Sequence, residues 1–599
     1  MNEALIEPLK YYTEQARQQH HKNANDYFDK LVDISGIDLD EHRKTIAQYK
    51  EQQEKISNLD RQISKYNTYR ILLIVAAVIG VIITIAGFDG NYWLSLVGIP
   101  MIIAAIVVIV KKINPPLKDF NGVLEAETAV ANELHTVAES QMQCLNALFN
   151  DTDTLELIKT TIPEFTFDYN FSTKRRKELI DKYQFTDMID EDCSMLDMLS
   201  GTFMDNPFLY ERYVIHSIGS ERYEGSLEIS WVEYYTDGNG NRVSQRRYQT
   251  LYASVEKPKP FYVTKTMLYY GCQGAPDLSF SRNSKNTKNK SEGAIARMAK
   301  AGERKMQRQA RKSVKEGGNF TEMANAEFDG LFGAFDRDNE VQFRMMFTPL
   351  AQTNIVKLIK SKDGYGDDFD FCKLNRLNVI CTDHHQTWDM NTGAERYYSY
   401  DIDLARDQFL SYNNEYFKSL FFDFAPLFSI PLYHQPPVQS LEPMETKYDN
   451  GETHYTEYEY EVLANALSDE LIAHEDSVTD TIIKTKGIRS ENGFDTVSIT
   501  AYSYTAVQRV DYVTVLGGDQ NYHNVPVPWI EYVPVEKTTT MSVKELNMSS
   551  LELRSKYGGN EEMSEYSERA SYCHGLFAYL HTEDGEASVI ERKLSKILN

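Results

Sequence analysis

The chain has 599 residues, a formal net charge of −25 and 42% hydrophobic residues. This length allows several domains, and the hydrophobic content excludes a wholly disordered protein. The negative charge argues against nucleic acid as a partner, because most of the surface would repel a phosphate backbone. The six cysteines have no CxxC or paired spacing, which favours free thiols over a disulfide framework.

The first 70 residues predict an N-terminal helical region in the cytoplasm. This segment is rich in Glu, Gln, Lys and Arg, and Ser35-Gly36 interrupts its helical pattern. Because the segment is polar throughout, we expect no cleavable signal peptide at its start.

Two uncharged apolar runs follow, at residues 71–87 and 92–110. As helices they would be about 25 and about 28 Å long, close to the ~30 Å hydrocarbon thickness of a bilayer. The alternative is a helical hairpin buried in a soluble core, but a core helix rarely has every face apolar. The sequence therefore predicts a transmembrane hairpin over residues 71–110, in which Gly80 and Gly98 are small enough to permit close helix contact.

The charges that flank the two runs predict the topology. Lys65 and Arg70 precede the first run, Lys111 and Lys112 follow the second, and the short turn between the runs has no basic residue. Basic residues flank the cytoplasmic ends of membrane spans. We therefore expect a two-span protein of the cell membrane with both termini in the cytoplasm.

Residues 113–150 predict a coiled-coil-like helix beside the membrane. Pro115-Pro116 interrupts the chain, and a heptad pattern begins directly after it. Eight of its ten seam positions are apolar. The seam consists of Leu117, Phe120, Leu124, Glu127, Ala131, Leu134, Ala138, Gln141, Leu145 and Leu148. Two interpretations stay open: this helix pairs with residues 46–69 as a stalk, or each helix packs separately on the soluble domain.

Residues 161–281 predict a β-rich domain. Its clearest element is a hairpin of residues 223–235 and 242–255, whose side chains alternate between polar and apolar. The connecting turn contains Asp-Gly and Asn-Gly steps, which supply the positive φ of tight hairpin turns. Pro258 and Pro260 are expected to end the second strand. The 39 tyrosines of the chain suit both strands and interaction surfaces.

Residues 282–318 predict a basic linker followed by an amphipathic helix. From Arg282 to Glu316 there are twelve Lys or Arg and three Glu, a net charge of +9 in a chain whose total is −25, so the remainder carries −34. Basic residues spaced by three or four share one face of a helix. This predicted membrane or partner surface consists of Arg297, Lys300, Arg304, Arg308, Arg311 and Lys315.

Several partners compete for this basic face. Anionic lipid headgroups would attract it by about 1 kcal/mol per basic residue. An acidic protein surface would also pair with it, and residues 442–486 of the same chain carry a net charge of −9. Nucleic acid is disfavoured by the charge of the remaining chain. A solvated linker without a dedicated role is the remaining interpretation.

Residues 319–599 predict one or more α+β domains. Strand patterns occur at residues 341–347, 377–382, 497–504, 509–516 and 529–535, and helix patterns at residues 350–359 and 462–473. Because strands and helices are interspersed without a βαβ rhythm, we predict an α+β fold that follows the N-terminal helical stalk and hairpin.

Two short segments are candidate cation sites. Asp336, Asp338 and Glu340 precede a predicted strand, and carboxylates on one face can hold a divalent cation, but a solvated loop explains them equally well. Residues 381–385 contain His384 and His385, but neighbours on an extended chain point in opposite directions and no second ligand pair stands at a known spacing. We therefore assign no metal, cofactor or catalytic residue from the sequence.

The chain has no P-loop, GxGxxG, HExxH or GxSxG motif. Its segments PDLSFSR at residues 276–282 and FTPLAQ at residues 347–352, together with its layout, resemble uncharacterised bacterial two-span membrane proteins with a large cytoplasmic region. The resemblance implies no activity, because none is known for those proteins.

The leading functional hypothesis is a membrane-anchored cytoplasmic scaffold or interaction protein, with the bilayer and an unidentified protein as partners. The alternative is a membrane-tethered enzyme, a divalent-cation-dependent hydrolase built on acidic residues. A pocket with converging carboxylates and shifted pKa values would favour the enzyme. An exposed tyrosine-rich surface without such a pocket would favour the scaffold.

Overall fold

The computed structural model describes residues 3–88, 92–168, 170–171, 173–185, 191–236, 238, 240–386, 390–436, 455–491, 493–546 and 569–581. The fold mixes helices and sheets and has two long apolar helices on its N-terminal side, as the sequence predicts. The chain divides into two compact units. Unit 1 comprises Met1–Asn23, Asn150–Gly393 and Tyr412–Asn599, and unit 2 comprises Ala24–Phe149 and Ala394–Ser411.

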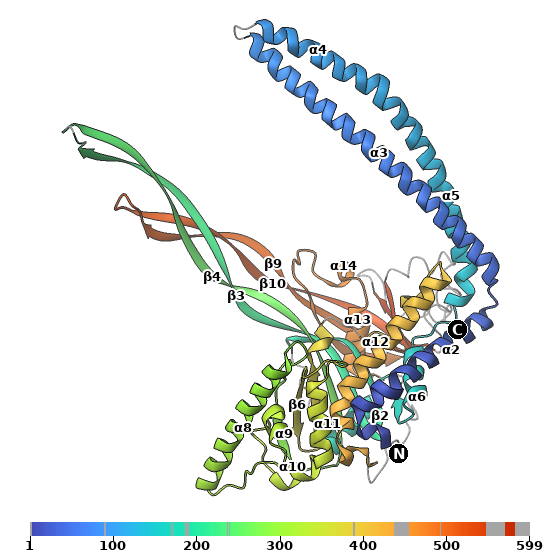
Figure 1. Cartoon of the computed structure of the whole chain (residues 1–599). Coiled ribbons are helices and arrows are strands. Elements are labelled where there is room, and N and C mark those ends of the chain that lie inside the picture. The colour runs from blue at the N-terminus through green and yellow to red at the C-terminus, as the bar shows by residue number, and fades with distance from the viewer. Residues whose placement is uncertain are drawn as a thin grey trace. The chain divides into compact units, whose positions relative to one another are not determined.

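Unit 2 is built from long antiparallel helices (Figure 1). Its elements are the end of α2 (Arg17–Ser35), α3 (Leu39–Phe88), α4 (Tyr92–Val108), the π-helical turn η3 (Ile109–Ile113), α5 (Asn114–Asn146), η5 (Ala394–Tyr397) and the start of α12 (Ile402–Phe428). The predicted break after α2 is confirmed. It occurs at Gly36, whose φ of +65° is a left-handed conformation that glycine adopts at little cost.

The two apolar runs are exposed rather than packed in a core. In the part of the chain that the structure describes, the helices Leu39–Ile85 and Leu96–Asn146 are long and apolar enough to cross a bilayer, and only 6% and 17% of their most apolar stretches are buried. Ile82 and Leu96, for example, are 61% and 65% exposed. A hairpin in a soluble core would be mostly buried, so the exposure argues against that alternative.

The two apolar helices touch through glycine. A Cβ atom on Gly98 would lie 2.2 Å from Thr84 Oγ1 and 2.7 Å from the Gly80 carbonyl oxygen. A Cβ atom on Gly80 would lie 2.9 Å from the side chain of Ile102. The close contact predicted from these small residues is therefore present. The predicted turn includes residues 89–91, which lie outside the described part of the chain.

Helix α5 lies antiparallel alongside the part of α3 that precedes the apolar run. The rings of Tyr66 and Phe120 have centroids 5.6 Å apart, and Gln141 Nε2 donates a hydrogen bond of 3.2 Å to Thr45 Oγ1. All ten predicted seam positions, nine in α5 and Leu148 just after it, are buried or half-buried. Of the two arrangements considered above, the structure therefore has the paired one.

The helical path continues across Pro115-Pro116, where we predicted an interruption. The π-helical turn η3 precedes the two prolines, which occupy the first turn of α5. The first N–H groups of a helix have no partner within it, so proline is tolerated there. The wider π turn takes up the irregularity that the missing donors create.

The paired helices predict a sharp difference between two adjacent positions of α5. Ala138 is fully buried, whereas Val137 is 42% exposed. Ala138→Asp places a charge in the helix interface and should destabilise the pairing by at least about 2 kcal/mol. Val137→Asp places the same charge on the exposed side of the helix and should leave the pairing of α5 with α3 intact.

Cross-linking of cysteines introduced at Thr45 and Gln141, in a chain whose native cysteines are replaced by serine, measures this pairing. We expect the cross-link to fall to background in Ala138→Asp and to persist in Val137→Asp. Equal yields in the two variants would contradict the pairing of α3 with α5.

Unit 1 contains a seven-stranded antiparallel sheet in the order β1-β2-β3-β4-β7-β6-β5. Its strands are β1 (Phe165–Phe167), β2 (Cys193–Phe203), β3 (Asn206–Thr236), β4 (Arg242–Gly271), β5 (Ser279–Arg282), β6 (Phe369–Leu374) and β7 (Leu377–Thr382). The regions 161–281 and 319–599 therefore contribute strands to one sheet. Strands β3 and β4 extend far beyond the others as a two-stranded ribbon (Figure 1).

A second, five-stranded antiparallel sheet has the order β11-β12-β10-β9-β8. Its strands are β8 (Ile482–Glu491), β9 (Phe494–Leu516), β10 (Tyr522–Glu545), β11 (Ala570–Cys573) and β12 (Leu576–Leu580). The helix α13 (Glu457–Asn465) joins the two sheets: Tyr458 and Val462 pack in one core cluster, while Tyr460 and Leu463 pack in another. Strands β9 and β10 extend as a second ribbon.

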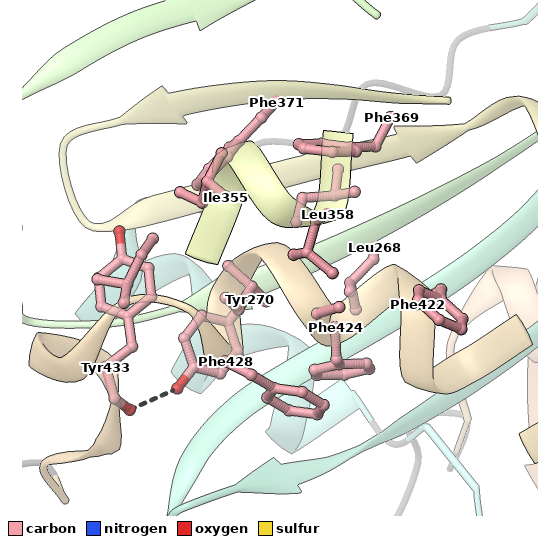
Figure 2. Packing of buried hydrophobic residues seen from close by; sticks show 14 of the residues in the cluster. Leu268, Tyr270, Ile355, Leu358, Phe369, Phe371, Phe422, Phe424, Phe428 and Tyr433 are labelled. Carbon is pink, nitrogen blue, oxygen red and sulfur yellow. Dashed lines mark hydrogen bonds between the residues drawn. The ribbon is translucent and has the colours of Figure 1, made fainter. Parts of the chain in front are cut away.

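Helices cover the seven-stranded sheet and bury an aromatic core. The remaining elements are η1 (Glu3–Ile6), α1 (Pro8–Tyr11), η2 (Tyr12–Ala16), α6 (Asp153–Thr161), α7 (Thr173–Tyr183), α8 (Glu292–Lys315), α9 (Ala326–Phe332), α10 (Glu340–Met346), α11 (Pro349–Lys360), η4 (Asp383–Gln386), η6 (Pro431–His434) and α14 (Asp469–Ile472). Figure 2 shows Tyr270 and Phe371 of the sheet in one buried cluster with Phe424 and Phe428 of α12. The Tyr270 hydroxyl donates a 3.3 Å hydrogen bond to the Tyr433 carbonyl oxygen.

Several predicted elements are confirmed. Residues 377–382 form β7 and residues 350–359 lie in α11. The predicted strands at 497–504 and 509–516 join into the single strand β9, and residues 529–535 lie in β10. The predicted helix at 462–473 is divided between α13 and α14.

The predicted strand at residues 341–347 is wrong, because this segment forms the helix α10. Asn339 caps the helix by accepting a hydrogen bond from the Gln342 N–H. Phe343, Met346 and Phe347 are all buried, and their spacing by three and four is that of one helical face. The cap at Asn339 and the helical spacing of the buried residues therefore favour a helix over a strand at this segment.

The prediction that Pro258 and Pro260 end a strand is also wrong, since β4 continues through both to Gly271. The His216 N–H donates to the Asp192 carbonyl, on the side away from β4, so the opposed pair His216–Tyr262 shares no ladder hydrogen bonds. The pairs Ile218–Pro260 and Ser220–Pro258 lie two and four residues further along β3, so they also share no ladder hydrogen bonds. Their nitrogens therefore face the open edge of the ribbon, where proline costs no hydrogen bond.

Strand β10 follows the same rule. Tyr504, which is opposite Pro534, donates its N–H to Thr479 Oγ1 and accepts at its carbonyl from Val478, both away from β10. Pro526 and Pro528 are separated from Pro534 by an even number of residues, so all three face the open edge of β10.

Candidate functional site

A buried polar cluster lies where β7 ends beside α12. His384 and His385 belong to η4, which follows β7 directly, and Asp423 lies on α12. Within the described residues, these three are the group of His, Cys, Asp or Glu side chains placed to hold a metal ion: one ligand atom from each lies within 4.8 Å of the others. Tyr210 of β3 completes the cluster.

Hydrogen bonds connect the members of this cluster closely. Asp423 Oδ2 lies 2.7 Å from both Tyr210 Oη and His385 Nε2, and the tyrosine hydroxyl also contacts His385 Nε2. Asp423 Oδ1 accepts a 2.8 Å hydrogen bond from Thr382 Oγ1 and lies 3.4 Å from His384 Nε2. The Asp423 carboxylate is therefore the centre of the cluster.

A second carboxylate and an aromatic ring orient His384. Its Nδ1 lies 2.7 Å from Asp368 Oδ2. Its ring stacks on Tyr365 with centroids 3.8 Å apart and an interplanar angle of 2°. The Tyr365 hydroxyl in turn donates a 2.8 Å hydrogen bond to Glu415 Oε1. These contacts hold the imidazole with Nε2 toward Asp423.

The pKa values in the cluster follow from burial and from opposite charges. Burial lowers the pKa of His384, but the Asp423 and Asp368 carboxylates outweigh it and raise this pKa above its usual value. Burial raises the pKa of Asp423, but the two histidines and the Tyr210 hydrogen bond hold it below its usual value. Burial raises the pKa of Tyr210 well above its usual value, so the phenol remains a hydrogen-bond donor.

Residues 383–386 are not extended, as the sequence analysis assumed for the segment 381–385. The two histidines lie in a 3-10 helix rather than on an extended strand, so their rings come within 4.3 Å of one another. Asp423, Tyr210 and Asp368 were missed, because only the fold brings them to the histidines. The sequence did contain one signal: Asp423 is a lone acid within the apolar run LFFDFAPLF of residues 420–428.

The triplet Asp336, Asp338 and Glu340 does not form a shared cation site. The Asp336 carboxylate accepts hydrogen bonds from Ser281, and Asp338 Oδ1 accepts one from the Ser279 N–H at 2.7 Å. Glu340 is the first residue of α10 and pairs with Arg337 at 2.7 Å. Each carboxylate therefore has its own partner, because residues 340–346 are a helix and not the predicted strand.

The predicted basic helix is α8, and the six predicted surface residues share its solvent face. Arg297, Lys300, Arg304, Arg308, Arg311 and Lys315 are all exposed. Within the described part of the chain, none of the six forms a salt bridge. The helix begins at Ser291, whose side chain accepts a hydrogen bond from the Ala294 N–H.

The opposite face of α8 packs on the protein itself. Ile295, Ala299 and Met306 are buried, and a Cβ atom on Gly302 would lie 2.0 Å from the carbonyl oxygen of Gly330 in α9. This glycine contact fixes α8 on α9. The thin apolar side is therefore covered by the core, and only the basic face is available to a partner.

The two β-ribbons are the most extended surface of unit 1. Beyond Ile215 and Met267, β3 and β4 pair with each other and with no further strand of the seven-stranded sheet among the described residues. The part of β3 from residue 216 to residue 236 spans at most about 65 Å at ~3.3 Å per residue. Both faces of such a ribbon are open to solvent unless another element covers them.

The ribbons cover part of each other by crossing. A Cβ atom on Gly225 of β3 would lie 2.0 Å from the carbonyl oxygen of Pro526 in β10. Beside this point, Lys257 Nζ lies 2.6 Å from Asp511 Oδ2 and 4.2 Å from the centroid of the Trp529 ring. Trp529 Nε1 donates a 2.9 Å hydrogen bond to Asp511 Oδ1. Backbone contact and a charged cluster thus fix the crossing.

The tip of the second ribbon contacts the side of the first. The Gly518 N–H donates a 2.7 Å hydrogen bond to Gln249 Oε1, and a Cβ atom on Gly518 would lie 2.9 Å from Trp231. The end of the first ribbon, comprising the described residues between 231 and 248, begins at this contact and continues beyond it. We call this segment the ribbon end.

Aromatic and arginine side chains gather on the ribbon end. Tyr234, Tyr235 and Tyr248 are exposed, Tyr248 by 75%. Arg242 lies over the Tyr234 ring at 5.1 Å, and Arg247 pairs with Glu233 at 2.9 Å. Tyrosine, tryptophan and arginine are the residues that contribute most to protein–protein binding.

A ligand-sized cleft of about 780 Å³ lies at the base of the two ribbons. Acidic residues line it together with one lysine, one histidine and several tyrosines. Its lining includes Glu191, Asp192, His216, Tyr262, Lys484, Tyr502, Tyr504 and Glu536.

Comparisons with protein-family models, with curated proteins and with solved structures find no match to the chain. The function therefore has to be inferred from the geometry of the chain itself.

The crossing predicts that Gly225 cannot carry a side chain. Gly225→Val would force the ribbons apart at Pro526, at a cost of about 1–3 kcal/mol. Amide hydrogen exchange at Gly518 reports on the separation, because this amide is hydrogen-bonded to the other ribbon. We expect exchange at least about tenfold faster in Gly225→Val.

Gly238→Val is the matched control, since a Cβ atom there would have nothing within 4 Å. Exchange at Gly518 should remain unchanged in this variant. If Gly225→Val also leaves the exchange unchanged, the crossing does not occur at this point.

Proposed function

We propose that the protein is a membrane-anchored interaction protein whose first β-ribbon binds a protein partner. The ribbon end carries this proposal. It exposes Tyr234, Tyr235 and Tyr248 beside arginines, and Tyr234 and Tyr235 lie beyond the contact of Trp231 with the second ribbon. Exposed aromatic and arginine side chains supply binding energy when a partner covers them.

The anchor in this proposal is the hairpin of α3 and α4. Its support is the exposed apolar surface of the two helices, which requires an apolar environment. The antiparallel contact of α3 with α5 supports placing both flanks on one side of the bilayer. The basic residues of those flanks then favour the cytoplasmic side of the cell membrane for both termini.

The topology is tested by labelling single cysteines in intact cells with a membrane-impermeant maleimide. Cysteines at Asp60 and Val314 should be protected until the membrane is permeabilised, and a cysteine at Gly90 should react from outside. A cysteine at Val314 would be accessible to the reagent once the membrane is permeabilised, because this side chain is 71% exposed. External labelling at Val314 would overturn the proposed orientation.

The ribbon end is tested by photo-cross-linking in native membranes. A photoreactive residue at Tyr248 should give one defined protein adduct, whereas the same residue at Val341, which is similarly exposed, should not. Adding Tyr234→Ser and Tyr235→Ser should remove the adduct and change the free energy of unfolding by no more than about 0.5 kcal/mol, as for other surface substitutions. Identical patterns at Tyr248 and Val341 would contradict the proposal.

The basic face of α8 is a second contact surface in this proposal. Its six exposed basic residues have no salt-bridge partner within the described chain, which supports an external partner. Anionic lipid headgroups are one candidate, because a tethered protein is always near the bilayer. An acidic protein surface is the other. Nucleic acid remains disfavoured by the overall charge of −25.

The cleft at the ribbon base favours the alternative function, a membrane-tethered enzyme. Its volume of about 780 Å³ is that of a small-molecule site, and it contains Glu191, Asp192 and Lys484. A hydrolase that uses a divalent cation would need carboxylates such as these. Retention of cation and substrate analogue by the wild type, and their loss in Asp192→Asn, would support this alternative over a purely binding role.

A further inference from the structure

The buried cluster around Asp423 has more polar contacts than protons to fill them. Tyr210 Oη, His385 Nε2 and Asp423 Oδ2 all contact one another. The phenol supplies one proton, the imidazole nitrogen at most one and the carboxylate none, so two protons serve three contacts. None of the three residues is more than 2% exposed, so bulk water does not reach them. The contact between Tyr210 Oη and His385 Nε2 therefore lacks a proton of its own, although each group has a hydrogen bond to Asp423.

We propose that this cluster binds a divalent transition-metal ion through Nε2 of His384, Nε2 of His385 and the Asp423 carboxylate. Two imidazoles and one carboxylate are a ligand set that suits Zn²⁺ and similar ions. The Tyr210 hydroxyl contacts two of these ligands, His385 Nε2 and Asp423 Oδ2. Metal–ligand bonds of about 2.0–2.2 Å require ligand atoms further apart than the 2.7 Å seen here, so His385 and Tyr210 move back slightly on binding.

The surroundings of two of the ligands are those of a metal site. Asp368 Oδ2 lies 2.7 Å from His384 Nδ1, and Thr382 donates a 2.8 Å hydrogen bond to Asp423 Oδ1. Histidine ligands usually donate their second N–H to a carboxylate, and ligating carboxylates are themselves hydrogen-bonded. The stacked ring of Tyr365 further restricts His384.

The site is closed, which points to a structural role. The side chains of His385 and Asp423 are 1% exposed and that of His384 is 7% exposed. Catalytic metal sites keep an open position for substrate, whereas structural sites are enclosed. The ion would connect η4, at the end of β7, to α12. This function is separate from partner binding by the ribbon end.

The test uses the full-length protein in detergent, stripped of metal with a chelator and then titrated with Co²⁺ and Zn²⁺. We expect one equivalent of Co²⁺ to give the visible absorption of an ion bound by nitrogen and oxygen, and Zn²⁺ to displace it. Zn²⁺ at about a hundred times its dissociation constant should raise the thermal midpoint by about 2–3 °C. Absence of both the absorption and the shift would overturn the proposal.

Variants separate this site from adventitious binding. His384→Gln removes a ligand at the edge of the cluster and should weaken Co²⁺ binding at least about 100-fold. Asp368→Asn removes the negative charge from the group that orients His384 and should weaken Co²⁺ binding about 10- to 100-fold. His474→Gln removes a partly exposed imidazole elsewhere and should bind as the wild type does. If His384→Gln does not fold, Asp368→Asn alone decides. Wild-type affinity in Asp368→Asn, or in a folded His384→Gln, would overturn the site.

Discussion

A two-stranded β-ribbon buries little surface in water, and this limit determines the architecture of the two long hairpins of unit 1. Isolated hairpins are marginally stable at best. The ribbon of β3 and β4 and the ribbon of β9 and β10 therefore support each other by crossing, with Gly225 against Pro526. The contacts among Lys257, Asp511 and Trp529 secure the same point.

Strand β3 connects the two functional proposals physically. It contributes Tyr210 to the buried cluster and Trp231 to the ribbon end. These residues are 21 positions apart on one continuous strand, a distance of at most about 70 Å. The cluster fixes the base of β3 against α12, and the crossing fixes its middle. The ribbon end is thus the free part of a strand whose other parts are held.

Local patterns predicted the elements that depend on nearby residues. The apolar runs, the heptad of α5, the basic face of α8 and the hairpin at residues 223–255 all repeat with the period of their own secondary structure. Features that depend on distant neighbours were missed. Whether Pro258 ends a strand depends on which edge its nitrogen faces, and the importance of Gly225 depends on a ribbon some 300 residues later in the chain. Asp423 likewise meets the histidines only through the packing of α12.

The prolines of the ribbons make their two edges chemically different. Pro258 and Pro260 interrupt the donors on the open edge of β4, and Pro526, Pro528 and Pro534 do so on that of β10. The free stretches of β3 and β9 contain no proline and keep a full row of donors and acceptors. Any incoming strand, whether from another protein or from a second copy, can therefore extend each ribbon from one side only. Further strands would therefore add only at the free edges of β3 and β9. The proline-containing edges of β4 and β10 would prevent growth of a fibril in both directions.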